Sequence, residues 1–333
     1  MTNAPDFVAW FGPDAFDASY GYDLPALRSV RPCLAPPGFS EHWRARYQRA
    51  RGVSGVMHRV EVGTLGGHEV FSITFPSTDD RLLGGWLALP RKGDVRRGVV
   101  QSHGYGGRAG PEAEMLSPGT AVLWPVARGL PEASLLPDLP AVAAEHVLTG
   151  IDSTDTYILG GCAEDLWCAA TALSNLVGQV PLHFVGSSFG GGVGALALPW
   201  DDRFVSGALR VPSFGQYDLR LQMPCTGSGE AVRTHVAAHP EARDVLAFFD
   251  ASTAATFLDI PMLLGCALWD PAVPPPGQFA IQNAIAHAQE FIFHAGHADY
   301  PGQEEQLAAW GRRVHALINS IDGTDDIDGI TAR

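Results

Sequence analysis

The sequence contains no run of the ~20 consecutive apolar residues that a membrane-spanning helix needs. Its first residues, MTNAPDFVAWFGPDAFDASYGYD, have neither a basic stretch nor a long apolar one, which excludes the usual pattern of a secretory signal peptide. No internal repeat is visible. From these absences we expect a protein that neither spans a membrane nor follows the secretory route.

Cysteine is scarce, with five residues in 333, and no two of them have the CxxC spacing. An odd number of scattered cysteines indicates neither a disulfide framework nor a zinc site. We therefore expect reduced, mostly buried thiols in a cytoplasmic protein, with no catalytic or metal-binding role for any of them. The five residues are Cys33, Cys162, Cys168, Cys225 and Cys266.

Basic residues are also few, 22 against 36 acidic ones, which gives a formal net charge of −14. A surface this acidic repels phosphate backbones and anionic lipids, so we expect no nucleic acid and no membrane surface among the partners. Hydrophobic residues make up 46% of the chain and charged residues 17%, as in ordinary globular proteins. The length allows one large α/β domain or two smaller ones.

The first part of the chain predicts an arm followed by a hairpin sheet. A helix is expected at 40–51, after the Pro-Pro-Gly break, and residues 1–55 should form an N-terminal arm that packs on the core. Apolar runs at 56–65, 68–75 and 82–90 predict strands, and the alternation within them favours antiparallel pairing.

From Arg97 onward, short apolar runs alternate with helical segments such as 164–178. Strands buried on both faces and separated by helices indicate a mostly parallel sheet. We therefore expect a catalytic α/β domain at 56–320, with helices on both faces of the sheet, and an acidic, frayed tail at 321–333. Residues 130–160 read as irregular, as lids and binding loops often do. The predicted strands are 98–104, 121–129, 181–186, 206–212, 260–270 and 290–297.

The segment 186–190 fits the pattern G-x-S-x-G, which is weak evidence by itself. Its surroundings strengthen it, because a predicted strand runs directly into it and a glycine-rich helix follows. This strand–turn–helix arrangement is the nucleophile elbow of α/β-hydrolases, with Ser188 as the nucleophile. The structural alternative is a glycine-rich turn without catalytic function.

The other two members of a triad follow the serine in the order that this fold requires. Asp270 ends one predicted strand and His297 ends the next, so His297 would act as the base and Asp270 would orient it. Asp270 could instead be a turn residue before a proline, and Asp299 is a rival acid close to the base. A metal site formed by His294, His297 and Asp299 is less well supported, because no fourth ligand accompanies them.

An oxyanion hole needs two N–H donors near the serine. Phe189, the residue after the nucleophile, supplies one backbone donor, and Tyr105 in the loop His103–Gly107 supplies the second. The side chains of Tyr105, Phe189 and Pro212 should close the acyl side of the substrate pocket.

Taken together, these segments resemble the acetyl xylan esterases and cephalosporin C deacetylases, a carbohydrate-esterase branch of the α/β-hydrolases. The similarity runs from about residue 22 to 318. It rests on the segments YDLPALRSVRP, PPGFSEHWRARYQRA, HGYGG, DTYILGGCAEDLWCAATAL, GSSFGGG, LWDPAVPPPGQFAIQNAI and the Gly-His pair at 296–297.

The resemblance implies the same triad, the same oxyanion donors and hydrolysis of acetyl esters of small sugars or drug-like alcohols without a cofactor. It also implies a homo-oligomer that encloses the sites. The chain departs from the family pattern at Phe189, where glutamine is usual, and at Ala298, where glutamate is usual. Arg128-Gly129-Leu130-Pro131 stands in place of Arg-Gly-Gln-Gly.

Two other functions stay open on the sequence. A peptidase or thioesterase could use the same triad, since fold alone does not decide the substrate. A non-catalytic binding protein of hydrolase fold is the other alternative, and the intact serine, aspartate and histidine argue against it.

Overall fold

The computed structural model describes residues 5–321, and a nine-stranded sheet forms the centre of this part of the chain. Strand order is β1-β2-β3-β5-β4-β6-β7-β8-β9. The first three strands, β1 (His58–Leu65), β2 (His68–Pro76) and β3 (Leu82–Pro90), are antiparallel, as the alternation predicted.

The remaining strands run parallel to one another and confirm the mostly parallel sheet of an α/β-hydrolase. β3 pairs antiparallel with the first of them in space, β5, and so joins the two parts of the sheet. The parallel strands are β4 (Arg97–Gln101), β5 (Thr120–Pro125), β6 (Leu182–Ser187), β7 (Phe204–Arg210), β8 (Met262–Ala267) and β9 (Gln289–Phe293).

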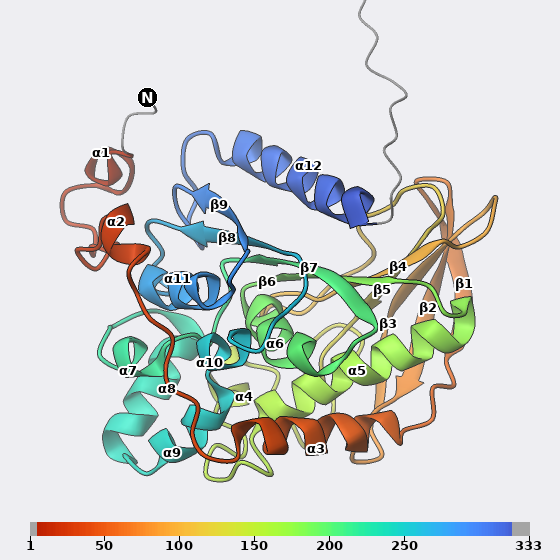
Figure 1. Cartoon of the computed structure of the whole chain (residues 1–333), viewed down its shortest axis with the longest axis horizontal. Coiled ribbons are helices and arrows are strands. Elements are labelled where there is room, and N and C mark those ends of the chain that lie inside the picture. Colours follow the sequence, from red (N-terminus) through yellow and green to blue (C-terminus); the bar gives the residue numbers. More distant parts are fainter. Residues whose placement is uncertain (1–4, 322–333) are drawn as a thin grey trace, which may run out of the picture.

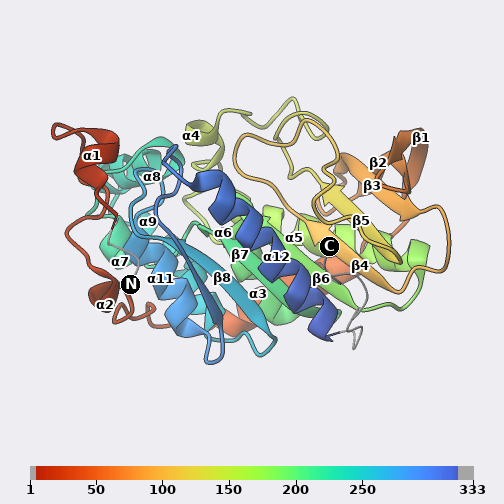
Figure 2. The same cartoon turned by 90° about the horizontal axis from the view of Figure 1, so that it is seen from above.

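Helices cover both faces of this sheet (Figure 1). One face carries α3 (Phe39–Arg51), α5 (Ile158–Val177), α6 (Phe189–Ala197) and α11 (Pro275–Ala284). On the other face α12 (Gln303–Ile321) lies across the strands, as Figure 2 shows. Alternation along β6 explains the two layers, because Phe184 packs in the first core and Val185 in the second.

The other helices are short, apart from α8. They are α1 (Phe7–Phe11), α2 (Leu24–Leu27), α4 (Ala143–His146), α7 (Tyr217–Arg220), α8 (Gly227–Ala238), α9 (Ala242–Leu246) and α10 (Ala251–Ala255), with 3-10 turns η1 (Leu198–Trp200) and η2 (Ala247–Phe249). Within 130–160, regular structure is confined to α4 and the first turn of α5, so this segment is irregular as expected.

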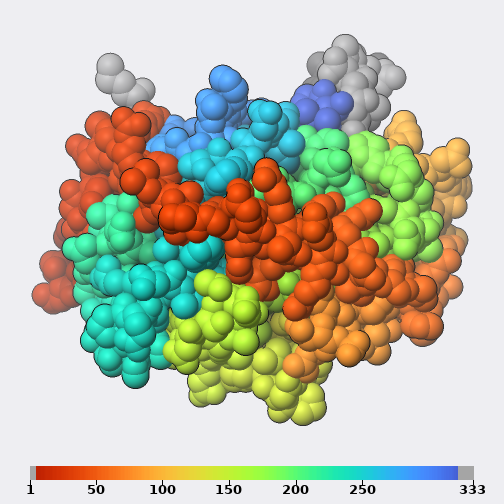
Figure 3. Space-filling model, turned by 60° about the horizontal axis from the view of Figure 1, so that its bottom comes forward, coloured from red at the N-terminus to blue at the C-terminus, as the bar shows by residue number. Residues whose placement is uncertain are grey.

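The N-terminal segment lies along the outside of the molecule (Figure 3). Its helix α3 begins at Phe39, one residue from the prediction, and packs on α5 through the buried Trp43, whose ring meets Trp167 edge-on. Earlier in the segment, Phe11 stacks on Trp269 with ring centroids 3.9 Å apart. The division into an arm, a catalytic domain and a tail stays a prediction, and the tail lies outside the described residues except for Ile321.

Candidate active site

Ser188 occupies a sharp turn between β6 and α6. Its backbone has φ 54° and ψ −116°, in the left-handed half of conformational space that side chains rarely adopt. Glycines permit the turn, because a Cβ at Gly186 would lie 2.6 Å from the carbonyl oxygen of Gly190. A Cβ at Gly190 would in turn lie 2.5 Å from Ser102 Oγ. The predicted strand–serine–helix elbow is therefore present.

Ser188, His297 and Asp270 form one hydrogen-bonded chain. Ser188 Oγ lies 2.8 Å from His297 Nε2, and His297 Nδ1 lies 2.8 Å from Asp270 Oδ2. The Asp270 side chain is fully buried, whereas 27% of the His297 side chain is exposed. With Nδ1–H donating to the carboxylate, Nε2 is free to accept the proton of the serine hydroxyl.

Asp270 accepts hydrogen bonds from other donors besides His297. Its Oδ1 accepts the backbone N–H groups of Ala272 and Val273, both at 2.9 Å. Its Oδ2 also accepts Nε2–H of Gln278 on α11, at 3.0 Å. Gly296 lets the carboxylate come this close, because a Cβ there would lie 2.2 Å from Oδ2. The sequence analysis predicted none of these contacts to Asp270.

The N-terminal segment also reaches this site. The backbone N–H of Asp270 donates to the carbonyl oxygen of Ala18 at 3.0 Å. Trp269, the residue before Asp270, stacks on Phe11 of the same segment. The N-terminal segment thus contributes to the position of Asp270.

Asp299 lines the cavity that Ser188 and His297 also line. It is exposed and makes no hydrogen bond to His297 in the described structure. The ring of His294 packs against Trp10 and Tyr300 instead of turning toward His297. Among residues 5–321, no three histidine, cysteine or acidic side chains are placed to hold a metal ion.

The loop that carries Tyr105 lies beside the serine. A Cβ at Gly104 would be 3.9 Å from Ser188 Cβ. His103 anchors the loop: its Nε2 accepts the backbone N–H of Ala127 at 3.1 Å, so its Nδ1 carries the proton that is donated to the Gly104 carbonyl at 2.7 Å. Burial lowers the pKa of His103 to about 4, which keeps this imidazole neutral.

The backbone N–H groups of Tyr105 and Phe189 donate to no carbonyl or side chain within residues 5–321. That is the condition that donors of an oxyanion hole must meet before substrate binds. Their neighbour Gly190 is tied down, because its N–H donates to the His103 carbonyl at 3.0 Å.

A cavity of about 1080 Å³ opens over Ser188 and His297. Tyr105 lines it, but Phe189 and Pro212 do not. The Phe189 ring is buried and packs on the Tyr105 ring, with centroids 4.3 Å apart, and Pro212 is buried against Gly191. The expectation that these two side chains close the acyl side is wrong for the described cavity, since both lie behind its wall.

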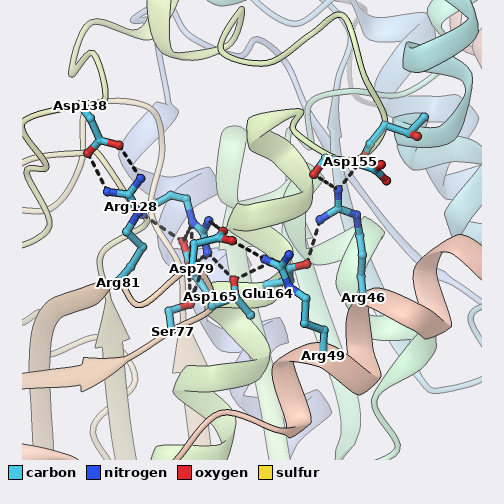
Figure 4. A network of polar contacts seen from close by, with 12 residues as sticks. Arg46, Arg49, Ser77, Asp79, Arg81, Arg128, Asp138, Asp155, Glu164 and Asp165 are labelled. Atoms are coloured by element: carbon cyan, nitrogen blue, oxygen red, sulfur yellow. Dashed lines mark hydrogen bonds and ion pairs between the residues drawn. The ribbon is translucent and has the colours of Figure 1, made fainter.

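Arg128 and Asp165 belong to a network of ion pairs and hydrogen bonds (Figure 4). Arg128 donates to both oxygens of the buried Asp165 on α5, at 2.8 to 3.1 Å, and pairs with Asp79 at 3.0 Å. This network fixes the start of the segment 128–132. The segment in turn binds the residue that follows the loop His103–Gly107, the oxyanion loop, because the Pro131 carbonyl accepts the N–H of Arg108 at 3.0 Å.

A serine elbow, a histidine and a buried aspartate at the carboxyl ends of a mostly parallel sheet define an α/β-hydrolase. The chain belongs to the acetyl xylan esterase family: the family model described as acetyl xylan esterase (AXE1) matches residues 23–313. It is therefore a carboxylic ester hydrolase.

Solved structures show the same fold. Acetyl xylan esterase 1 from Thermoanaerobacterium sp. JW/SL YS485 has a TM-score of 0.75 and 18% identity, over 90% of this chain and 100% of the other. For the acetyl xylan esterase from Paenibacillus sp. R4 the values are 0.76 and 20%, over 89% and 99%. An acylaminoacyl peptidase from Pyrococcus horikoshii has a TM-score of 0.60 and 17% identity, over 81% of this chain and 44% of its own.

The described helices include none that is both long and apolar enough to cross a membrane.

Proposed function

We propose that this protein hydrolyses acetyl esters of sugars or other small alcohols through an acyl-enzyme formed on Ser188. Family membership supplies the acetyl ester as substrate class. The observation that carries the assignment of residues is the unbroken chain of 2.8 Å contacts from Ser188 through His297 to Asp270.

In the first half of the reaction, Ser188 Oγ attacks the acetyl carbonyl carbon while His297 Nε2 takes the hydroxyl proton. Negative charge then develops on the carbonyl oxygen, where the N–H groups of Tyr105 and Phe189 stabilise it. Asp270 stabilises the imidazolium that forms. His297 returns the proton to the alcohol oxygen as the C–O bond breaks, which leaves acetyl-Ser188.

In the second half, His297 takes a proton from a water molecule, and the hydroxide attacks the acetyl carbonyl. Collapse of this intermediate releases acetate and returns the proton to Ser188. All of these steps use groups of the chain itself, with no cofactor.

The test is the turnover of p-nitrophenyl acetate and of acetylated sugars by the wild type and by Ser188→Ala. We expect a loss of about 10⁴-fold or more in the variant, and labelling of the wild type alone by a fluorophosphonate. A thioester and a peptide belong in the same panel, since the triad could also act on them. Full activity of a clean Ser188→Ala preparation would refute the proposal.

We also propose that the enzyme works in the cytoplasm as a homo-oligomer. All five cysteines are free thiols in the structure, which supports a reducing compartment. The family resemblance supports the oligomer, and light scattering coupled to size-exclusion chromatography would measure its mass.

A further inference from the structure

Arg210, the last residue of β7, lies directly beside the serine elbow. It pairs in register with Ser187, and its carbonyl oxygen accepts the backbone N–H of Ser188 at 2.9 Å. Its side chain leaves the sheet on the same face as Ala208, which packs in the core beneath α12. Arg210 and Ser188 line the same cavity.

The guanidinium group of Arg210 has almost no partner in the protein. Nε donates to Ser187 Oγ at 3.2 Å. Its two Nη atoms make no hydrogen bond within residues 5–321, and no carboxylate oxygen of that part lies within 4.0 Å of the group. Neither Nη atom is fully buried. Arg210 lines the cavity, so its side chain lies where a molecule bound there could meet a guanidinium group that the protein leaves without a carboxylate.

Two other arginines near the site are paired with carboxylates. Arg108 pairs with Glu112 at 2.8 Å, and Arg128 pairs with Asp165 and Asp79. For Arg210, desolvation lowers the pKa of the guanidinium, and the negative charge of Glu114 opposes this only in part. An arginine stays charged in a protein, so the cavity holds a positive charge without a direct counter-ion.

We propose that Arg210 binds a carboxylate on the alcohol part of the ester, so that the enzyme prefers acetyl esters of anionic alcohols, such as acetylated sugar acids. Two free Nη–H groups match the two oxygens of a carboxylate. The anion belongs to the alcohol part, because an acetyl group has no place to carry it. This inference rests on the proposed function, which makes Ser188 the acceptor of the acetyl group.

The chain as a whole repels such a substrate, since its net charge is −14. Arg210 therefore acts at short range, once the ester has entered the cavity. Glu114 is the competing carboxylate there: it lines the cavity, is exposed and forms no ion pair with another described residue. Removal of its charge should strengthen the preference for anions, whereas removal of the Arg210 charge should weaken it.

The experiment compares 4-acetoxybenzoate with the neutral 4-acetoxybenzamide, which carries the same acetyl group on an alcohol of similar shape. The measured quantity is the ratio of their kcat/KM values, so that general damage to the site cancels. We expect Arg210→Gln to lower this ratio by about tenfold or more, as for loss of a charge-assisted hydrogen bond. Arg210→Lys should recover part of it, and the comparison variant Glu114→Gln should raise it.

A ratio that stays within about twofold in Arg210→Gln would overturn the proposal. So would an equal fall of the ratio in Glu114→Gln. Calorimetric binding of 4-acetoxybenzoate to Ser188→Ala, with and without Arg210→Gln, gives a readout that needs no turnover. If the wild type hydrolysed neither ester, the proposed function would fail, and an unchanged Kd in this binding assay would separately refute the role of Arg210.

Discussion

Asp270→Asn is the substitution for which the structure gives the most specific expectation. Asp270 accepts four hydrogen bonds, two on each oxygen, and an asparagine can accept on one side only. If the amide oxygen keeps the Oδ1 position, it still accepts the N–H groups of Ala272 and Val273. The amide NH₂ then takes the Oδ2 position, opposite His297 Nδ1 and Gln278 Nε2.

Gln278 cannot turn its amide to relieve this arrangement. Its Oε1 accepts the N–H of Ala267 at 2.8 Å, and its Nε2 donates to the Val273 carbonyl at 2.7 Å. One donor–donor contact with the introduced asparagine therefore remains, which costs about 1–3 kcal/mol of unfolding free energy. In the opposite orientation the asparagine NH₂ group would face the backbone N–H groups of Ala272 and Val273, which would cost more unfolding free energy.

The expected effect of Asp270→Asn on kcat is larger than its effect on stability. His297 Nδ1 must accept from the new NH₂ group, which places the imidazole proton on Nε2, where it cannot take the proton of Ser188. We expect kcat to fall about 10⁴-fold, the order that this tautomer change costs in a serine triad. The assay is kcat and KM on p-nitrophenyl acetate, with urea unfolding of the same preparations.

Asp299→Asn is the matched control, because Asp299 is two residues from His297 in sequence but makes no hydrogen bond to it in the described structure. We expect it to keep near wild-type kcat. A crippled Asp299→Asn beside a mild Asp270→Asn would refute the reasoning.

The remaining expectations concern other parts of the molecule. Phe189→Gln or Phe189→Leu should keep far more activity than Phe189→Pro, which removes the oxyanion N–H; equal losses in kcat would show that the ring matters instead. Because the pKa of His103 is lowered from 6.5 to about 4, the native state favours the neutral ring, so stability present above pH 6.5 should fall by up to about 3 kcal/mol as the pH drops toward 4. Urea unfolding across that range tests this, and a flat profile would contradict it. Asp165→Asn should lower the unfolding free energy by about 3 kcal/mol, since it leaves Arg128 buried with one carboxylate fewer; chemical denaturation measures the loss, and an unchanged midpoint would argue against it. Finally, kcat/KM should fall from p-nitrophenyl acetate through butyrate to octanoate, because family membership predicts an acyl site for acetyl and longer chains would press on the oxyanion loop at Tyr105. A steady rise with chain length would contradict the acetyl preference.

Much of this site follows from local sequence. Ser188 and Asp270 follow buried strands, and His297 follows the partly buried edge strand β9. Parallel strands bring their carboxyl ends to one edge of a sheet, so the meeting of these residues was predictable. Their hydrogen bonds agree with that order. The direction of a side chain at a helix start is less predictable. Phe189 points into the core against Tyr105, and its position in the motif does not reveal this.

Other features depend on partners far apart in the chain, so no local pattern predicts them. Arg128 and Asp165 are 37 residues apart, and Arg46 and Glu164 are 118 apart. The pairing of Asp270 with Gln278 depends on how α11 packs against β8. The lack of a partner at Arg210 is a property of the folded cavity alone, since the sequence has acidic residues in plenty.

Different contacts support the Asp270–His297 side of the site and its oxyanion side. Asp270 and His297 are positioned by Gln278 of α11 and by the N-terminal segment, through the contact with Ala18. The oxyanion side is held by His103 and, through Arg128, by α5. In the described structure the two sets share no hydrogen-bond partner apart from those at the serine elbow. Damage to one support should therefore act on proton transfer, and damage to the other on charge stabilisation. The N-terminal segment and the Arg128 network thus each bear on a different part of the catalytic machinery, the first on the proton acceptor and the second on the oxyanion donors.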